Sequence, residues 1–425
     1  MLFFSFDNRN SKKNVFPFFS VCKRWNGLMS LFCFQMTTLF VYDYGVEYDN
    51  SLLIGTKNNL INESQLLRIA ASTPNVRSLH LNRHVRGITP DGIDRLAQLW
   101  PRVEELDLEG GDFYEQVLVT LTRHFPLLRK FKMEGRFYGS AQLFDTIFSN
   151  HRNLVEFECN FHFGADQNWF RSCHVPLERF AVNHFWGGNA TLDTLENCCK
   201  DSLKTIQVVF GLKGQSELIG RILSTFHELR VVSFGNFEFS LRSPPVLPHL
   251  EKFCLLSQFS ENELENLIDF LKSYPHLKEL HLERWTADDR SVEKLATSLP
   301  YLRSLTFYSS QLTRAGWMKL SALKLESFNA GLTNCAIESD LRAFVGQMPF
   351  LQRLTVWDVR FRWNDHFLSL FKSIRDDIRA SGSDRQLWVS RDGVRFFALD
   401  SSDKCTDEAI EKFFTEMNKK HRPNC

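Results

Sequence analysis

The sequence lacks the features that mark most nucleic-acid-binding proteins and most enzymes. Its formal net charge is only +1 at pH 7 over 425 residues, whereas binding to phosphates through charge needs a marked basic excess. It contains no glycine-rich phosphate loop, and no serine, histidine and aspartate at a spacing that supports a hydrolase. We therefore expect a protein that binds no nucleic acid, needs no cofactor and is not an enzyme.

Long apolar runs and a secretion signal are also missing. The apolar stretch over residues 27–41 is about 15 residues long and contains Gln35, whereas a membrane-spanning helix needs roughly 20 apolar residues. The chain opens without a basic segment, and Asp7 interrupts the first apolar residues, which is unlike a signal peptide. We expect a soluble protein of the cytoplasm, with the nucleus as the alternative, and no membrane partner.

The ten cysteines include no Cys-x-x-Cys pair and suggest no disulfide framework, so we expect a reducing compartment. Cys159, His162, Cys173 and His174 could be drawn as a zinc site, but their spacing fits no standard zinc finger. Cys159 also falls on a position that we expect to be buried in a strand. We therefore expect no metal.

What the sequence does contain is an internal repeat. Twelve segments, among them "PHLKELHL" and "PYLRSLTF", follow one template: apolar, two variable, apolar, one variable, apolar. Eight of the twelve have a proline one or two places ahead, and the segments recur about every 25 residues. Their first apolar residues are Val76, Val103, Leu128, Leu154, Leu177, Leu203, Leu229, Leu250, Leu277, Leu302, Leu325 and Leu351.

Amphipathic helical patterns lie between these segments. Thr89, Ser260 and Thr286 stand just ahead of three such patterns, where a hydroxyl group can cap a helix. Glu263 and Asp289 follow Ser260 and Thr286 by three residues, as in a capping box. The repeat is therefore one strand followed by one helix.

One strand and one helix about every 25 residues is the leucine-rich-repeat signature. Burying three apolar strand positions contributes at most roughly 5 to 9 kcal/mol, whereas ordering one repeat costs roughly 25 to 50 kcal/mol in backbone entropy. A single repeat cannot fold alone, so stacking must supply the missing burial. We predict an α/β fold, a leucine-rich-repeat solenoid shaped like the ribonuclease-inhibitor horseshoe, with strands on the concave side and helices outside.

Three parts follow from this interpretation. Residues 37–380 form the solenoid of about twelve repeats, residues 381–425 form a C-terminal cap, and residues 1–36 stand ahead of the solenoid as a separate segment. In the cap, two short apolar segments flank Asp392-Gly393, a dipeptide typical of hairpins, and Thr406 can cap a final helix. The cap would cover the open edge of the last repeat.

The segment "SVCKRW", from Ser20 to Trp25, stands ahead of the repeats. It resembles the second half of an F-box, and an F-box fragment followed by leucine-rich repeats is the layout of F-box/leucine-rich-repeat proteins. The resemblance implies that residues 1–36 are a partial, helical F-box-like segment in which the residues around Phe3–Phe6 end a helix. The resemblance implies that the segment docks on the Skp adaptor of a cullin-type ubiquitin ligase while the repeats hold the target protein. Docking would fall to Val21, Cys22 and Trp25, which share one helical face. The alternative is that this face only caps the first repeat.

The resemblance makes the chain a substrate-recognition adaptor, with the Skp adaptor, the cullin complex and a target protein as partners. The alternative is a leucine-rich-repeat interaction scaffold with no ligase connection.

The variable strand positions of the second to fourth repeats carry many charges. Because side chains alternate across a strand, these residues should project from the concave sheet. They form an acidic patch that includes Glu134 and is interrupted by Lys130 and Lys132. The candidate target-binding residues in it are Glu105, Asp107, Glu109, Glu156 and Glu158. The acidic face could bind a basic segment of a partner, or it could simply be a solvated sheet surface.

Large aromatic residues follow the predicted strands, where half-buried tryptophan and tyrosine often form interface hot spots. The alternative for each is packing between adjacent repeats. The residues that we expect to contact the target are Trp169, Trp186, Trp285, Tyr308 and Trp357.

Cys405 and Asp407 match the Cys-x-Asp triplet that some bacterial leucine-rich ubiquitin ligases use as a thiol nucleophile. Such enzymes devote a large separate domain to this chemistry, and the segment after Cys405 is short. An adjacent carboxylate would also raise the pKa of the thiol. We therefore expect no catalytic thiol.

Overall fold

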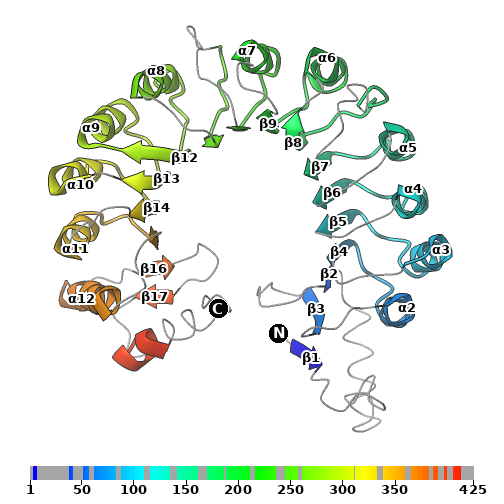
Figure 1. Ribbon diagram of the computed structural model, residues 1–425, viewed down its shortest axis with the longest axis horizontal. Coiled ribbons are helices and arrows are strands. Elements are labelled where there is room, and N and C mark those ends of the chain that lie inside the picture. Colours follow the sequence, from blue (N-terminus) through cyan, green and yellow to red (C-terminus); the bar gives the residue numbers. More distant parts are fainter. Residues whose placement is uncertain are drawn as a thin grey trace, which may run out of the picture. The chain divides into compact units, whose positions relative to one another are not determined.

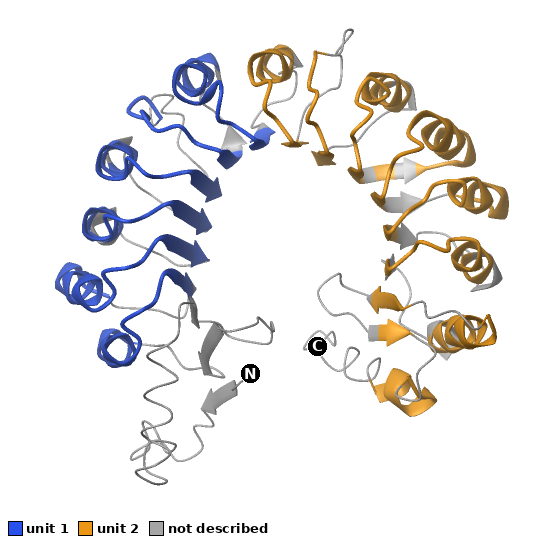
Figure 2. Ribbon diagram, turned by 180° about the vertical axis from the view of Figure 1, so that it is seen from behind, with its two compact units in different colours: residues 1–211 blue, residues 212–425 orange. Residues whose placement is uncertain are grey.

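Strands and helices alternate along the chain, as the repeat predicts. The computed structural model describes residues 3–6, 38–41, 51–56, 62–82, 88–109, 115–134, 141–160, 170–185, 188–210, 216–235, 245–256, 261–310, 312–332, 338–358, 365–381, 386–390, 397–399 and 405–412. They belong to two compact units, residues 1–211 and 212–425 (Figure 2).

The first unit is a single parallel sheet with helices on one side of it (Figure 1). Its strands lie in the order β1-β3-β2-β4-β5-β6-β7-β8-β9. The elements are β1 (Phe3–Phe6), β2 (Thr38–Val41), β3 (Ser51–Thr56), α2 (Glu63–Ser72), β4 (Ser78–Asn82), α3 (Pro90–Leu99), β5 (Glu105–Glu109), α4 (Glu115–His124), β6 (Lys130–Glu134), α5 (Ala141–Asn150), β7 (Glu156–Asn160), β8 (Arg179–Phe185), α6 (Gly188–Cys199) and β9 (Thr205–Phe210).

The second unit has the same two layers. Its strands follow chain order from β10 to β17, parallel up to β16, and β17 pairs with β16 in the antiparallel sense. The elements are α7 (Ser216–Thr225), β10 (Val231–Gly235), β11 (Lys252–Leu256), α8 (Glu261–Leu271), β12 (Glu279–Ala287), α9 (Asp289–Ser298), β13 (Ser304–Ser310), α10 (Arg314–Leu320), β14 (Ser327–Leu332), α11 (Glu338–Gly346), β15 (Arg353–Asp358), α12 (Asp365–Ala380), β16 (Leu387–Ser390) and β17 (Phe397–Leu399).

The core of each unit lies between the sheet and its helices. The first apolar residue of every one of the twelve template segments is no more than 2% exposed, from Val76 to Leu351. The next two apolar positions of the template enter the same core, as Leu106 and Leu108 do in β5. Strands stay in register from one repeat to the next, so Leu106 is paired with Phe131 in β6. The predicted leucine-rich-repeat solenoid is therefore confirmed in both units.

Aromatic rings fill the core around β6, β7 and β8. Phe157 stacks on Phe131 with ring centroids 6.0 Å apart and on Phe180 with centroids 6.2 Å apart. Phe148 and Phe170 close this group from the helix side in a T-shaped contact at 4.9 Å. Each repeat thus packs directly on its neighbours, which is the interaction that a single repeat cannot supply for itself.

The helix caps agree with the sequence at two positions and differ at a third. Thr89 caps α3 by accepting a hydrogen bond from the backbone of Gly92, and Thr406 accepts one from the backbone of Ala409. Thr286 was the wrong cap for α9, because β12 extends through this residue and Asp288 caps the helix instead. Ser260 lies outside the described residues.

The ends of the chain bear on the predicted flanking segments. Phe3–Phe6 form β1, which pairs with β3, where the F-box resemblance implied the end of a helix. Phenylalanine favours strands, and this segment of three phenylalanines and Ser5 extends the parallel edge that β3 presents. The predicted C-terminal hairpin is confirmed by the β16–β17 pairing, whereas its Asp392-Gly393 turn lies outside the described residues.

Candidate functional site

One face of each sheet carries the side chains that the helices do not cover. In β5, β6 and β7, buried residues alternate with partly exposed ones. The partly exposed residues include all five acidic residues predicted to face a target, Glu105, Asp107, Glu109, Glu156 and Glu158. The parallel register then sets these positions side by side across neighbouring strands.

Two rows of alternating charge run across this face, and we call them the charge ladder. In one row, the Lys130 Nζ atom lies 3.0 Å from Glu105 Oε1 and 3.3 Å from Glu156 Oε1. The ladder consists of Glu105, Lys130 and Glu156 in this row and of Asp107, Lys132, Glu158 and Arg179 in the other.

The second row begins beside His80 and ends at Arg179. Lys132 Nζ lies 3.7 Å from Asp107 and 3.9 Å from Glu158. At the far end, Arg179 lies 3.1 Å from Glu158. At the near end, His80 Nδ1 lies 3.1 Å from Asp107 Oδ2. The ion pairs therefore hold the side chains of four neighbouring strands in place.

The ladder favours the charged forms of Glu105, Lys130 and Lys132. Burial disfavours the charged form of Glu105, but hydrogen bonds from Lys130 and Ser78 outweigh it and lower the pKa of Glu105. Hydrogen bonding to Glu105 raises the pKa of Lys130. Burial likewise opposes the charge of Lys132, but Asp107 and Glu158 outweigh it and raise the pKa of Lys132.

Negative charge exceeds positive charge on this face. Six carboxylates accompany only three cations when Glu109 and Glu134, which lie side by side at the carboxyl ends of β5 and β6, are counted with the ladder. One carboxylate oxygen of Asp107 is buried and has no hydrogen-bond partner among the described residues. The partly exposed carboxylates can accept further donors from a cationic partner.

The corresponding face of the second unit is less charged. Lys252 Nζ pairs with Glu279 at 2.8 Å, and the strands beyond them present mostly hydroxyl and amide side chains. Trp388 in β16 is 39% exposed and is in register with the exposed Arg353 of β15. Trp388 is a candidate contact residue that the repeat template did not identify, because it lies in the cap hairpin rather than in a template segment.

The structure places the predicted aromatic contact residues differently from the sequence. Trp285 is wrong as a target contact, because it lies inside β12, is only 3% exposed and packs on Phe307 with ring centroids 5.3 Å apart. Tyr308 and Trp357 lie within β13 and β15 rather than in loops after them. Trp169 and Trp186 lie outside the described residues.

The residues assigned to adaptor docking, Val21, Cys22 and Trp25, also lie outside the described residues. The predicted contact between this segment and a partner therefore stays a prediction.

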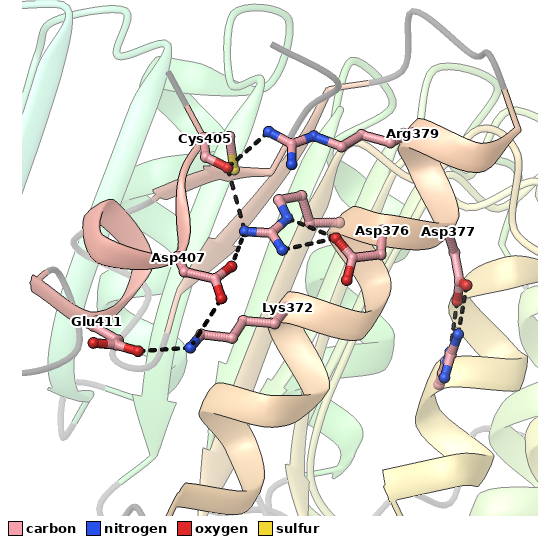
Figure 3. Close-up of polar contacts among 9 residues, drawn as sticks. Lys372, Asp376, Asp377, Arg379, Cys405, Asp407 and Glu411 are labelled. Atoms are coloured by element: carbon pink, nitrogen blue, oxygen red, sulfur yellow. Dashed lines mark hydrogen bonds and ion pairs between the residues drawn. The ribbon is translucent and has the colours of Figure 1, made fainter. Parts of the chain in front are cut away.

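A polar cluster joins α12 to the cap residues 405–412 (Figure 3). The Arg375 guanidinium contacts the carboxylates of Asp376 and Asp407 and donates to the backbone carbonyl of Cys405. Arg379 donates to the same carbonyl at 3.1 Å. Cys405 itself is 3% exposed. Asp407 thus faces cations on α12, and the geometry of the Cys-x-Asp triplet is that of a structural cap.

The two cysteines that were considered as zinc ligands lie in the core. Cys159 is 0% exposed and Cys173 is 1% exposed, and burial raises the pKa of the Cys159 thiol far above its ordinary value. His162 lies outside the described residues. Over the described ranges, no three side chains of histidine, cysteine, aspartate or glutamate are grouped as metal ligands.

Within the part of the chain that the structure describes, no helix has both the length and the apolar character needed to cross a membrane.

No family model matches the chain, and no curated protein matches its sequence. Among solved structures, it is similar to the Rad7–Elc1 complex of yeast, with 16% identity and a TM-score of 0.45 over 70% of this chain and 79% of that chain. It is also similar to an internalin from Listeria monocytogenes, with 15% identity and a TM-score of 0.38 over 74% of this chain and 85% of that one. It is also similar to the mouse RP105/MD-1 complex, with 15% identity and a TM-score of 0.36 over 80% of this chain and 62% of that one.

Proposed function

We propose that the chain is a non-enzymatic interaction protein that binds a target protein on the exposed faces of its sheets. The observation that carries this proposal is the charge ladder, in which ion pairs across four adjacent strands hold the partly exposed acidic side chains of β5 and β7 in place. A surface that is already ordered loses little side-chain entropy on binding. Its excess of carboxylates favours a target with a basic segment.

A finer proposal is that the chain is a substrate-recognition adaptor of a cullin-type ubiquitin ligase. It is supported by the resemblance of Ser20 to Trp25 to an F-box. The partners would then be the Skp adaptor, the cullin complex and a target protein, and other subunits would carry out the catalytic steps. A scaffold without a ligase connection is the alternative.

Binding on the ladder is tested with a fluorescent lysine-rich peptide as the probe. Glu109→Gln with Glu134→Gln removes two charges from the face and leaves its principal ion pairs intact. We expect this double variant to weaken binding several-fold at low salt. Glu217→Gln with Glu228→Gln is the matched control, because both side chains are exposed outside this face. Equal binding by the two double variants would contradict the proposed use of the ladder.

The ligase connection is tested separately with purified Skp adaptor and the full chain. We expect a stable complex that Trp25→Ala weakens. If the intact chain does not bind, the scaffold alternative stands and the peptide experiment is unaffected.

A further inference from the structure

A groove of about 530 Å³ opens on the first unit, at the amino-terminal ends of its strands. The residues that matter here are Glu104, Leu127, Arg129, Arg152 and Pro176, all of which line it. They lie in the turns that lead into β5 to β8, whereas the charge ladder lies on the open face of the sheet. The volume is within the roughly 300 to 1,000 Å³ typical of ligand sites.

Charged residues just ahead of the strands pair along this edge from repeat to repeat. In the first unit, Arg77 lies 3.0 Å from Glu104, and Lys204 lies 3.0 Å from Glu178. In the second unit, the Glu251 carboxylate forms ion pairs with Arg230 at 3.8 Å and with Lys278 at 3.6 Å. Most of the charged residues just ahead of the strands are therefore neutralised by an ion pair with a neighbouring repeat.

Arg129 interrupts the pattern. In the repeat before it, the corresponding residue is Glu104, whose carboxylate pairs with Arg77. In the repeat after it, the corresponding residue is Val155, which has no charge. Arg152 enters the same groove from the following turn. Neither arginine has an ion-pair or hydrogen-bond partner for its guanidinium within the described ranges, and both are exposed.

Apolar side chains line the same groove as the two arginines. Leu127 is 45% exposed, although leucine is usually buried, and Pro176 is exposed in the turn that leads into β8. The lining contains no aromatic residue on which a base could stack. Its charge is one glutamate against two arginines, which is too little for a nucleic-acid backbone.

We propose that this groove binds an acidic peptide segment that combines carboxylates with a large apolar side chain. Each guanidinium presents a planar set of donors that matches a carboxylate in two parallel hydrogen bonds. The apolar side chain would cover Leu127 and Pro176 and remove their surface from water. This site is separate from the charge ladder and does not rest on the ligase assignment.

Fluorescence anisotropy with the full chain tests the site. The probe is a labelled peptide with a Glu-Leu-Glu centre, and the matched peptide has Gln-Leu-Gln. Arg129→Gln with Arg152→Gln should lower the affinity for the acidic peptide by roughly tenfold or more. Arg68→Gln with Arg123→Gln removes two exposed positive charges from helices α2 and α4 and should leave the affinity unchanged.

Charge reversal provides the second arm. Arg129→Glu with Arg152→Glu should reject the acidic peptide and acquire binding to a peptide with a Lys-Leu-Lys centre. The inference is overturned if the wild-type chain does not prefer the acidic peptide to the glutamine peptide. It is also overturned if the control variant weakens binding as much as the groove variant, or if an oligouridylate binds more tightly than the peptide. Circular dichroism establishes that each variant is folded.

Discussion

At the scale of single residues, His151 stands out because it occupies a place that other repeats fill with a large apolar side chain. Trp100, Phe125, Phe226 and Tyr274 lie at this place in their repeats, just after a helix, and each is no more than 3% exposed. His151 is 1% exposed. Burial lowers its pKa to about 4, although the nearby backbone of Thr122 partly opposes this change. The folded protein therefore holds His151 neutral.

This burial predicts an acid-sensitive stability. The unfolded chain takes up a proton on His151 below about pH 6.5, whereas the folded chain does so only below about 4. The contribution of neutral His151 to the free energy of unfolding is complete above about pH 6.5 and is lost as the pH falls toward 4. At about 1.4 kcal/mol for each pH unit, the loss amounts to roughly 3 kcal/mol.

His151→Phe restores the residue type of the neighbouring repeat and should flatten this part of the profile. Urea unfolding between pH 7 and pH 4 measures it. An unchanged pH dependence in the variant would assign the effect to other groups.

The repeat template predicted the buried residues well because each position has a fixed relation to the core. The first apolar residue of a segment, such as Leu203 or Leu302, is buried in every repeat. The burial of residues outside the template was harder to predict from the sequence. Trp285 follows three clear strand positions, and only the extension of β12 brings its ring against Phe307. No periodic pattern distinguishes such a ring from one at an exposed rim.

At the scale of elements, neighbouring helices are joined by an acidic clasp at their amino-terminal ends. Glu63 at the start of α2 accepts hydrogen bonds from the backbone and hydroxyl of Thr89, at 2.8 and 2.7 Å, where α3 begins. These two hydrogen bonds lower the pKa of Glu63. Asp289 of α9 accepts from the same two groups of Thr313 at the start of α10. Each clasp thus connects the cap of one helix to the repeat before it.

A glycine makes room for each clasp. A Cβ atom at Gly92 would lie 2.2 Å from the Glu63 carboxylate, and one at Gly316 would lie 2.1 Å from the Asp289 carboxylate. Gly92→Ala should therefore destabilise the protein by about 1 kcal/mol, since the displaced hydrogen bonds outweigh the better helix propensity of alanine.

Gly346→Ala is the control, because nothing lies within 4 Å of its added Cβ atom, and it should be neutral or mildly stabilising. Thermal unfolding measures both changes. In a Glu63→Ala background, Gly92→Ala should lose its cost. If it does not, the clasp is not the cause.

The charge ladder makes a prediction for the sheet. Lys132 lies between Asp107 and Glu158, with Glu134 within 4.0 Å. Lys132→Gln leaves these carboxylates facing one another, so it should lower stability by roughly 0.5 to 1 kcal/mol at low salt, because the side chains are partly exposed. High salt should remove most of the difference. Urea unfolding at two salt concentrations is the measurement, and an effect independent of salt would contradict an electrostatic origin.

Element boundaries were only partly predictable. Both Thr286 and Asp288 are good capping residues, and the sequence contains a plausible partner for each at the third helical position. The structure selects Asp288, which exchanges hydrogen bonds with Ser291. Strand pairing of Thr286 with Ser309 in β13 decides between them. That pairing depends on the next repeat, so the local sequence could not specify it.

At the scale of the whole molecule, a terminal repeat needs extra support to stay folded, because it packs on only one neighbouring repeat. At the C-terminal end, α12 and residues 405–412 are joined through Arg375, which is 5% exposed. The same helix carries a second arginine pair at its surface, in which Arg342 of α11 contacts Asp377 through two hydrogen bonds of 2.6 Å. Both members of that pair are 46% exposed.

The two pairs allow a matched comparison of a buried and an exposed interaction. Arg375→Leu removes one of the two arginine donors to the Cys405 carbonyl and leaves Asp407 without this cation, so we expect a loss of roughly 1 to 3 kcal/mol in the second unit. Arg342→Gln should cost under about 1 kcal/mol, because exposed ion pairs contribute little. Hydrogen exchange followed by mass spectrometry reports where protection is lost. In Arg375→Leu it should fall first in α12, β16 and β17 and spread toward earlier repeats, while β4 to β8 keep theirs. Uniform loss over the chain, or equal effects of the two substitutions, would show that the cap is not what holds this end of the array.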